Sequence, residues 1–136
     1  MLSPSKEQTD VIEGIKNGDN IYVDAVAGSG KTTTVLSLAQ LLTNKSIIQF
    51  TYNTELRREV KEKVCKQNIK NIDIFTYHSF AYYYYSDEAS TDIGIFKIID
   101  NNLSPIKGLP KIDIIVLDEI QDMMSLYYVF IYKVLF

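Results

Sequence analysis

The sequence of 136 residues contains one cysteine, one histidine and no tryptophan, and it has no apolar run of membrane-spanning length. With Cys65 alone no intramolecular disulfide can form, and a zinc-type cluster of cysteine and histidine ligands is missing as well. The first ten residues, MLSPSKEQTD, lack the basic region and apolar run of a secretory signal. A transmembrane helix would need about 18 apolar residues in a row. We therefore expect an intracellular protein without a membrane partner.

The composition is typical of a globular domain. Hydrophobic residues make up 46% and charged residues 23% of the chain, so disorder of the whole chain is not expected. A chain of this size forms one domain and buries about 68–70% of its unfolded surface. Because the net charge is −3, a surface for nucleic acid would have to be a local patch. We expect a single domain over residues 1–136.

Short β-rich runs alternate with helix-like stretches, which is typical of an α/β protein with a parallel sheet flanked by helices. The expected helices cover residues 5–16, 30–42, 54–67, 78–85, 93–103 and 123–136. The expected strands cover residues 21–26, 46–52, 72–76 and 112–117. The last strand is apolar enough to be covered on both faces. The last helix is so apolar that we expect an exposed hydrophobic surface, and with it self-association or a partner.

The segment from Ala25 to Thr32 reads A-V-A-G-S-G-K-T and lies between an expected strand and an expected helix. Glycines let successive backbone N–H groups close around a phosphate, which also meets the N-terminus of the helix. Lys31 would reach the outer phosphates, and Thr32 would ligate Mg²⁺. The strict pattern G-x-x-x-x-G-K-[ST] has glycine where this sequence has Ala25. A glycine-rich corner without a ligand is the alternative.

The acidic segment Asp118-Glu119-Ile120-Gln121-Asp122 follows the last expected strand. Ligands of a parallel sheet gather beyond the carboxyl ends of its strands, so this segment and the phosphate-binding loop are expected to face one another. An aspartate there can hold Mg²⁺, and a glutamate beside it can deprotonate an attacking water. The alternative is a charged first turn of a helix. Together the two segments predict ATP-dependent hydrolysis.

Several segments in order resemble the motifs of UvrD/Rep/PcrA-like superfamily 1 DNA helicases. In chain order they are Gln8, the A-V-A-G-S-G-K-T loop of motif I, Phe50–Asn53 with Leu56 and Arg57 of motif Ia, Ile74–Phe80 of motif Ib, and the D-E-I-Q-D of motif II. The resemblance implies a P-loop NTPase with a RecA-like fold. Gln8 stands where the family reads adenine, although a capping box with Ser5 (S-x-x-Q) is an alternative role for it.

The resemblance implies roles for individual residues in binding ATP and Mg²⁺. Thr32 and Asp118 would hold Mg²⁺. Lys31 would bind phosphates, Glu119 would be the catalytic base and Gln121 would sense the γ-phosphate. The ATP-binding residues expected on this basis are Gln8, Ala25, Val26, Ala27, Gly28, Ser29, Gly30, Lys31, Thr32 and Thr33.

The resemblance also implies a track for single-stranded DNA. Its expected residues are Tyr52, Asn53, Thr76, His78 and Phe80. Residues 54–70 carry six basic and three acidic side chains, and a basic strip beside aromatics is how proteins follow a single strand. A solvated amphipathic helix gives the same pattern and is an alternative. His78 has no second ligand or nucleophile near it in the sequence, so a metal-binding or catalytic role is not expected.

The sequence departs from the family in two places. Between Phe80 and Asp118 there is room for at most one short helix, where the family usually inserts an accessory domain. After Asp122 the sequence continues only to Phe136, so motif III and the second RecA-like domain are missing from it. That domain supplies arginines to the ATP site, and such an arginine is worth about 10³–10⁵ in rate. We therefore expect slow hydrolysis unless a second chain supplies the missing half; the alternative is a nucleotide- or DNA-binding module without turnover.

Overall fold

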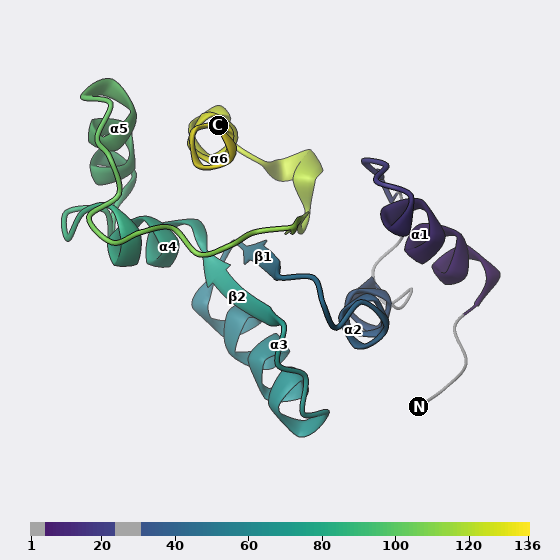
Figure 1. The fold of residues 1–136 in the computed structure, drawn as a ribbon. Helices are drawn as coiled ribbons and strands as arrows, with labels where there is room; N and C mark the ends of the chain where they lie inside the picture. The colour runs from purple at the N-terminus through teal and green to yellow at the C-terminus, as the bar shows by residue number, and fades with distance from the viewer. Residues whose placement is uncertain (1–4, 24–30) are drawn as a thin grey trace.

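The computed structural model describes residues 5–23 and 31–136. The elements are, in chain order, α1 (Lys6–Lys16), α2 (Lys31–Leu41), β1 (Ile47–Thr51), α3 (Thr54–Lys66), β2 (Ile72–Thr76), α4 (Tyr77–Tyr84), α5 (Asp92–Asp100), β3 (Ile114–Leu117), the short 3₁₀ helix η1 (Ile120–Asp122) and α6 (Ser125–Leu135). The three strands form one parallel sheet in the order β2–β1–β3, with helices around it (Figure 1). The expected α/β class with a parallel sheet is confirmed.

Alternating side chains of the strands serve two hydrophobic cores, one on each face of the sheet. Ile48 and Phe50 lie in the core that β1 shares with α4, α5 and α6. Ile47 lies in the other core, with side chains of α1, α2 and α3. A slip of one residue would exchange the two sets, so this pattern fixes the strand register. The register aligns Thr51 with Thr76 and Phe50 with Leu117, so all three strands end at the same edge of the sheet.

Most expected elements form with bounds close to those predicted. Strand β2 has the predicted bounds, and the aromatic stretch after it is the helix α4. Ser5 caps α1 through both hydrogen bonds of the predicted capping box. In α3 the apolar stripe is only partly buried, because Val60 is buried whereas Leu56 is 36% exposed. Local patterns of capping and periodicity therefore account for these elements.

The strand expected over residues 21–26 is not formed in its described part. Ile21, Tyr22 and Val23 lie outside any strand and are 37%, 66% and 48% exposed. Ile21 lies against Gly14 of α1, at a place where a Cβ on the glycine would collide with it. A strand needs a neighbour for its backbone hydrogen bonds. Within residues 5–23 and 31–136, no strand pairs with the outer edge of β3, so Ile21–Val23 stay outside the sheet although that edge is free.

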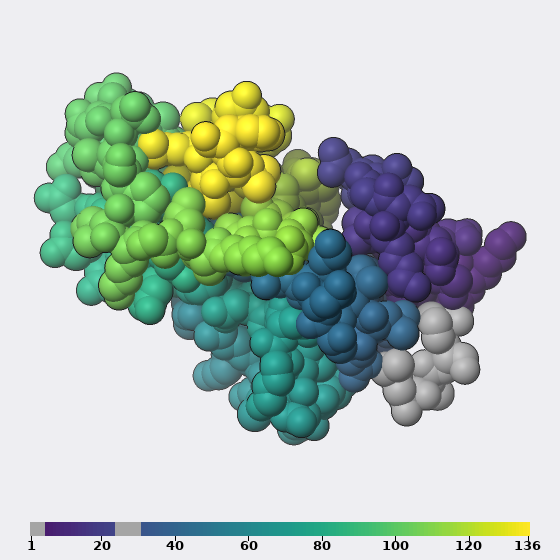
Figure 2. Space-filling view, in the orientation of Figure 1, coloured from purple at the N-terminus to yellow at the C-terminus, as the bar shows by residue number. Residues whose placement is uncertain are grey.

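The apolar helix α6 is covered on one side and exposed on the other. Tyr127, Phe130, Ile131 and Val134 are buried in the core. Its exposed large side chains are Tyr128, Val129, Tyr132 and Leu135. Figure 2 shows the residues of α6 in yellow at the molecular surface, beside the green residues of α5. The expected exposed hydrophobic surface is therefore present. Among the helices that the structure describes, none is both long and apolar enough to cross a membrane.

Candidate nucleotide site and nucleic-acid face

The first residue of α2 and the residue pair after β3 meet at the carboxyl edge of the sheet. Nζ of Lys31 lies 3.1 Å from Oε1 of Glu119, although 88 positions separate them in the chain. Of the expected phosphate-binding segment, Lys31 therefore lies against the acidic segment. Their side chains are 31% and 36% exposed, so solvent screens the ion pair and Lys31 can exchange Glu119 for another anionic partner.

Backbone and side-chain contacts fix the positions of Asp118 and Glu119. The N–H of Asp118 donates to the carbonyl of Phe50 at 3.2 Å, which extends the β1–β3 pairing by one residue. Glu119 has φ 51° and ψ 46°, a left-handed conformation that costs a residue with a side chain about 1–2 kcal/mol. Nε2 of Gln121 donates to Oε2 of Glu119, and the Tyr52 hydroxyl donates to the Glu119 carbonyl at 3.3 Å. Strain held by several contacts is characteristic of functional sites.

The surroundings shift the pKa values of the Asp118 and Glu119 carboxyl groups in opposite directions. Burial, and then the charge of Glu119, raises the pKa of the Asp118 carboxyl above its ordinary value. Hydrogen bonds from Gln121 and Lys31 lower the pKa of the Glu119 carboxyl. A divalent cation beside Asp118 would relieve the repulsion between the two groups. Carboxylate and hydroxyl oxygens are the donors that Mg²⁺ prefers, so Asp118 and Thr32 fit this ion in chemical type.

The remaining expected nucleotide-binding residues have different environments. Thr32 is half-buried and Thr33 is exposed in the first turn of α2. The predictions for Ala25, Val26, Ala27, Gly28, Ser29 and Gly30 lie outside the described residues. Oε1 of Gln8 accepts the backbone N–H of Ser5 at 2.9 Å, so the capping role is present; nothing tests the adenine-reading role.

Two of the expected nucleic-acid residues follow β1 at the same edge of the sheet. Tyr52 is half-buried beside the acidic segment, and burial together with the nearby acidic groups raises the pKa of its hydroxyl. Asn53 is exposed and caps α3, because its Oδ1 accepts the N–H of Leu56 at 2.8 Å. Tyr52 therefore borders the site of Lys31 and Glu119, and Asn53 follows it as the cap of α3.

Two other expected nucleic-acid residues are buried. Phe80 is 0% exposed and contacts the rings of Phe50 and Phe75 edge-on. Thr76 is 7% exposed, and its hydroxyl accepts the N–H of Ser79 as the cap of α4. In this structure Phe80 is therefore a core side chain, and the DNA contact expected for it stays a prediction. Thr76 likewise acts as a helix cap.

His78 is a motif Ib side chain with accessible surface and with polar partners on two other helices. Its Nε2 lies 2.7 Å from Oδ1 of Asp92, and the hydroxyl of Tyr127 donates to the same oxygen at 2.7 Å. These residues belong to α4, α5 and α6. The partners cannot be read from the sequence, because Asp92 lies 14 positions after His78 and Tyr127 lies 35 positions after Asp92.

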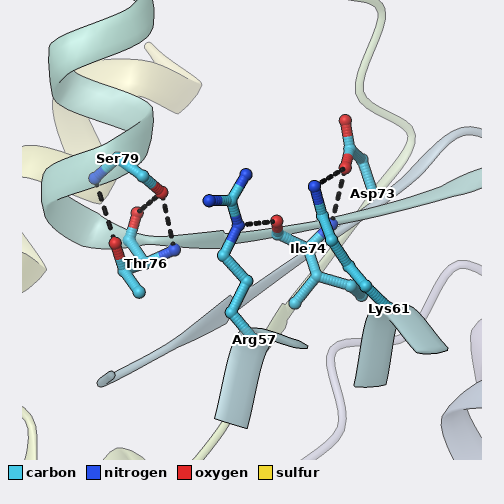
Figure 3. Close-up of polar contacts among 6 residues, drawn as sticks. All are labelled: Arg57, Lys61, Asp73, Ile74, Thr76 and Ser79. Carbon is cyan, nitrogen blue, oxygen red and sulfur yellow. Dashed lines mark hydrogen bonds and ion pairs between the residues drawn. The ribbon is translucent and has the colours of Figure 1, made fainter. Parts of the chain in front are cut away.

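Two side chains of the basic strip of α3, Arg57 and Lys61, contact the outer edge of β2 (Figure 3). Nε of Arg57 donates to the carbonyl of Ile74 at 2.8 Å, and its guanidinium lies 5.4 Å from the centre of the Phe75 ring. Oδ1 of Asp73 accepts the N–H of Ile74, while Lys61 approaches the same oxygen at 3.8 Å. Ser79 bonds both backbone groups of Thr76. Side chains thus bond the backbone groups of Ile74 and Thr76 at this edge.

Comparison with known proteins agrees with this geometry. The family model described as the UvrD/REP helicase N-terminal domain matches residues 5–106. A curated "Probable DNA helicase" of Mycoplasma pneumoniae is 28% identical over 89 residues, which cover 58% of this chain and 17% of that protein. The match therefore spans a small part of that relative.

No solved structure matches the chain. The family match ends before the acidic segment, which the fold places against Lys31. With three quarters of the chain inside the family model, and with the first residue of α2 and the end of β3 meeting at one edge of a parallel sheet, the chain belongs to the UvrD/REP helicase N-terminal domain family.

Proposed function

We propose that the chain is the ATP-binding and ATP-hydrolysing portion of a superfamily 1 DNA helicase, and that it binds Mg²⁺–ATP between Lys31 and the acidic segment. The observation that carries this proposal is the 3.1 Å contact between Lys31 and Glu119 at the carboxyl edge of the sheet. Ligands of parallel α/β sheets bind at this edge. Family membership supports ATP as the nucleotide and DNA as the partner.

When a nucleotide binds, its phosphates would replace Glu119 as the partner of Lys31. The phosphates, which carry more charge than one carboxylate, would draw its ammonium group away from Glu119. Loss of that cation would raise the proton affinity of the Glu119 carboxylate, which is what a general base needs. Gln121 donates to the second oxygen of Glu119 and would keep the carboxylate aimed as Lys31 leaves. Mg²⁺ held by Thr32 and Asp118 would neutralise charge on the phosphates.

Turnover by this chain alone is expected to be slow. Its two arginines, Arg57 and Arg58, both lie on α3, and Arg57 is bonded to the carbonyl of Ile74. An arginine that stabilises the transition state contributes about 10³–10⁵ in rate. We propose that a second RecA-like domain or chain supplies it. The position of the two arginines also supports the second candidate, a nucleotide- or DNA-binding module without turnover.

Single-stranded DNA would lie along the same edge of the sheet. Tyr52, Asn53 and His78 have accessible side chains there and follow the ends of β1 and β2. Tyr52 also contacts the Glu119 carbonyl. A strand bound across these residues would therefore touch side chains that border the nucleotide site.

Equilibrium titration with ATP and Mg²⁺ tests the nucleotide site. Lys31→Ala removes a charge-assisted bond to phosphate, so we expect ATP affinity to fall about 10–100-fold. Lys16→Ala, which removes an exposed lysine of α1, is the matched control and should bind as the wild type does. Equal affinity in the Lys31 variant would overturn the proposal. Phosphate release stimulated by single-stranded DNA would exclude the module without turnover.

A further inference from the structure

The single histidine of the chain is bonded through Nε2 to a carboxylate, and this partner indicates its tautomer. Hydrogen bonds from Tyr127 and then from His78 lower the pKa of the Asp92 carboxyl below its ordinary value, so it is ionised at neutral pH. An ionised carboxylate only accepts hydrogen bonds, so Nε2 of His78, at 2.7 Å from Oδ1, carries the proton. In the neutral ring the other nitrogen, Nδ1, is then a hydrogen-bond acceptor. Asp92 thereby decides which kind of ligand atom His78 can bind.

Tyr127 contacts both Asp92 and His78 and restrains the orientation of each side chain. Its hydroxyl donates to the oxygen that His78 also uses, at 2.7 Å. Its ring meets the His78 ring edge-on, with centroids 5.6 Å apart and planes at 84°. Because two donors from two helices share one oxygen, neither the carboxylate nor the imidazole can rotate without breaking a bond.

Tyr127 is itself held rigidly, in contact with side chains near the acidic segment. It is 7% exposed and stacks on Tyr77 with centroids 4.6 Å apart and planes at 4°. Its ring also approaches that of Tyr52, at 6.4 Å, and the Tyr52 hydroxyl donates to the Glu119 carbonyl. Helix α6, which carries Tyr127, follows η1 and the acidic segment directly. His78 is therefore connected to the acidic segment through Tyr127 and Tyr52.

We propose that Asp92 and Tyr127 are positioning residues that hold His78 so that its Nδ1 accepts a hydrogen bond from a base of single-stranded DNA. This inference rests on the proposed function, which places His78 on the nucleic-acid face. In single-stranded DNA the hydrogen-bond donors are on the bases, whereas phosphate oxygens only accept. An Nδ1 atom that accepts a hydrogen bond therefore contacts a base and not a phosphate oxygen.

Binding of a fluorescent mixed-sequence single-stranded oligonucleotide by the full chain, measured by anisotropy at pH 8 and several salt concentrations, tests this. His78→Ala should weaken binding about 3–10-fold, the net value of one hydrogen bond. Tyr127→Phe keeps the ring and loses one hydroxyl, and it should weaken binding about 2–5-fold. In the double variant the loss should equal that of His78→Ala alone, because Tyr127 acts through His78. The dependence of affinity on salt should not change, because no phosphate contact is lost.

Matched controls separate positioning from folding. Tyr132→Phe removes a hydroxyl from the exposed side of the same helix and should bind as the wild type does. Asp92→Asn keeps an oxygen acceptor and should bind more tightly than Asp92→Ala.

Three results would overturn the inference alone: Tyr127→Phe binding as tightly as the wild type, losses that add in the double variant, or a smaller salt dependence in His78→Ala. Wild-type affinity in His78→Ala would overturn both this inference and the place of His78 in the proposed function.

Discussion

The hydroxyl of Tyr77 is buried without a hydrogen-bond partner in the part of the chain that the structure describes. The residue is 1% exposed, and its ring stacks between Phe50 and Tyr127. Burial raises the pKa of this hydroxyl well above its ordinary value of 10.0. A buried hydroxyl without a partner carries the full cost of its lost hydration.

Tyr77→Phe should therefore stabilise the protein. The variant keeps the ring stack and removes the unsatisfied hydroxyl, so we expect the free energy of unfolding to rise by about 1 kcal/mol. Tyr127→Phe is the comparison, since it removes a hydroxyl that does have a partner, and it should lower the free energy of unfolding by about 1 kcal/mol. Urea unfolding measures both. A loss of stability in Tyr77→Phe would contradict this reading of the buried stack.

Asp92 should make stability depend on pH in the acid range. The pKa of Asp92 in the folded protein lies below the ordinary value of 3.8. The ionised carboxylate therefore adds to the free energy of unfolding above pH 3.8, and this stabilisation is lost as the pH falls through the folded pKa. Asp92→Asn should lower the melting temperature at neutral pH. The difference from the wild type should shrink as pH falls below about 4. A difference that stays constant down to pH 2 would rule out this contribution of the ionised carboxylate.

At the scale of elements, α3 protects the outer edge of β2. An edge strand with free backbone groups pairs readily with other chains. Arg57, Asp73 and Ser79 occupy the outward-facing groups of Ile74 and Thr76 (Figure 3). Arg57 therefore has a structural role, in addition to any part in a basic strip.

Arg57→Ala should destabilise the protein by about 1.5–3 kcal/mol, because it removes a charged donor from the Ile74 carbonyl. Arg58→Ala is the matched control, since this neighbouring arginine is exposed. Its effect on thermal unfolding should stay within about 0.5 kcal/mol. Similar unfolding curves for both variants would show that Arg57 does not seal the edge.

Elements with strong local signals could be predicted from the sequence. The capping box of Ser5 and the β-rich run of β2 are local, and both were predicted correctly. A strand also needs backbone hydrogen bonds to a partner, and the β-rich run around Tyr22 stays outside the sheet. The meeting of Lys31 with Glu119 followed from parallel sheet geometry. The burial of Phe80 and the bond of His78 to Asp92 depend on how separate helices pack, which no local pattern encodes.

For the whole molecule, the exposed side of α6 predicts association. Tyr128, Tyr132 and Leu135 are each more than half exposed on a helix whose other side is in the core. Surfaces of this kind bind other proteins or self-associate. Light scattering should show a mean mass that rises with concentration, and Tyr128→Glu combined with Tyr132→Glu should reduce the rise. A monodisperse monomer at high concentration would contradict this prediction.

The central claim is that Lys31 and the acidic segment hold one Mg²⁺–nucleotide between them. The most direct test is titration of ATP with and without Mg²⁺, in the wild type and in Asp118→Asn. In the wild type Mg²⁺ should raise ATP affinity about tenfold or more, which corresponds to about 1.4 kcal/mol. In Asp118→Asn most of that increase should disappear, while the weaker affinity measured without Mg²⁺ is retained. An equal effect of Mg²⁺ in both proteins would contradict the account.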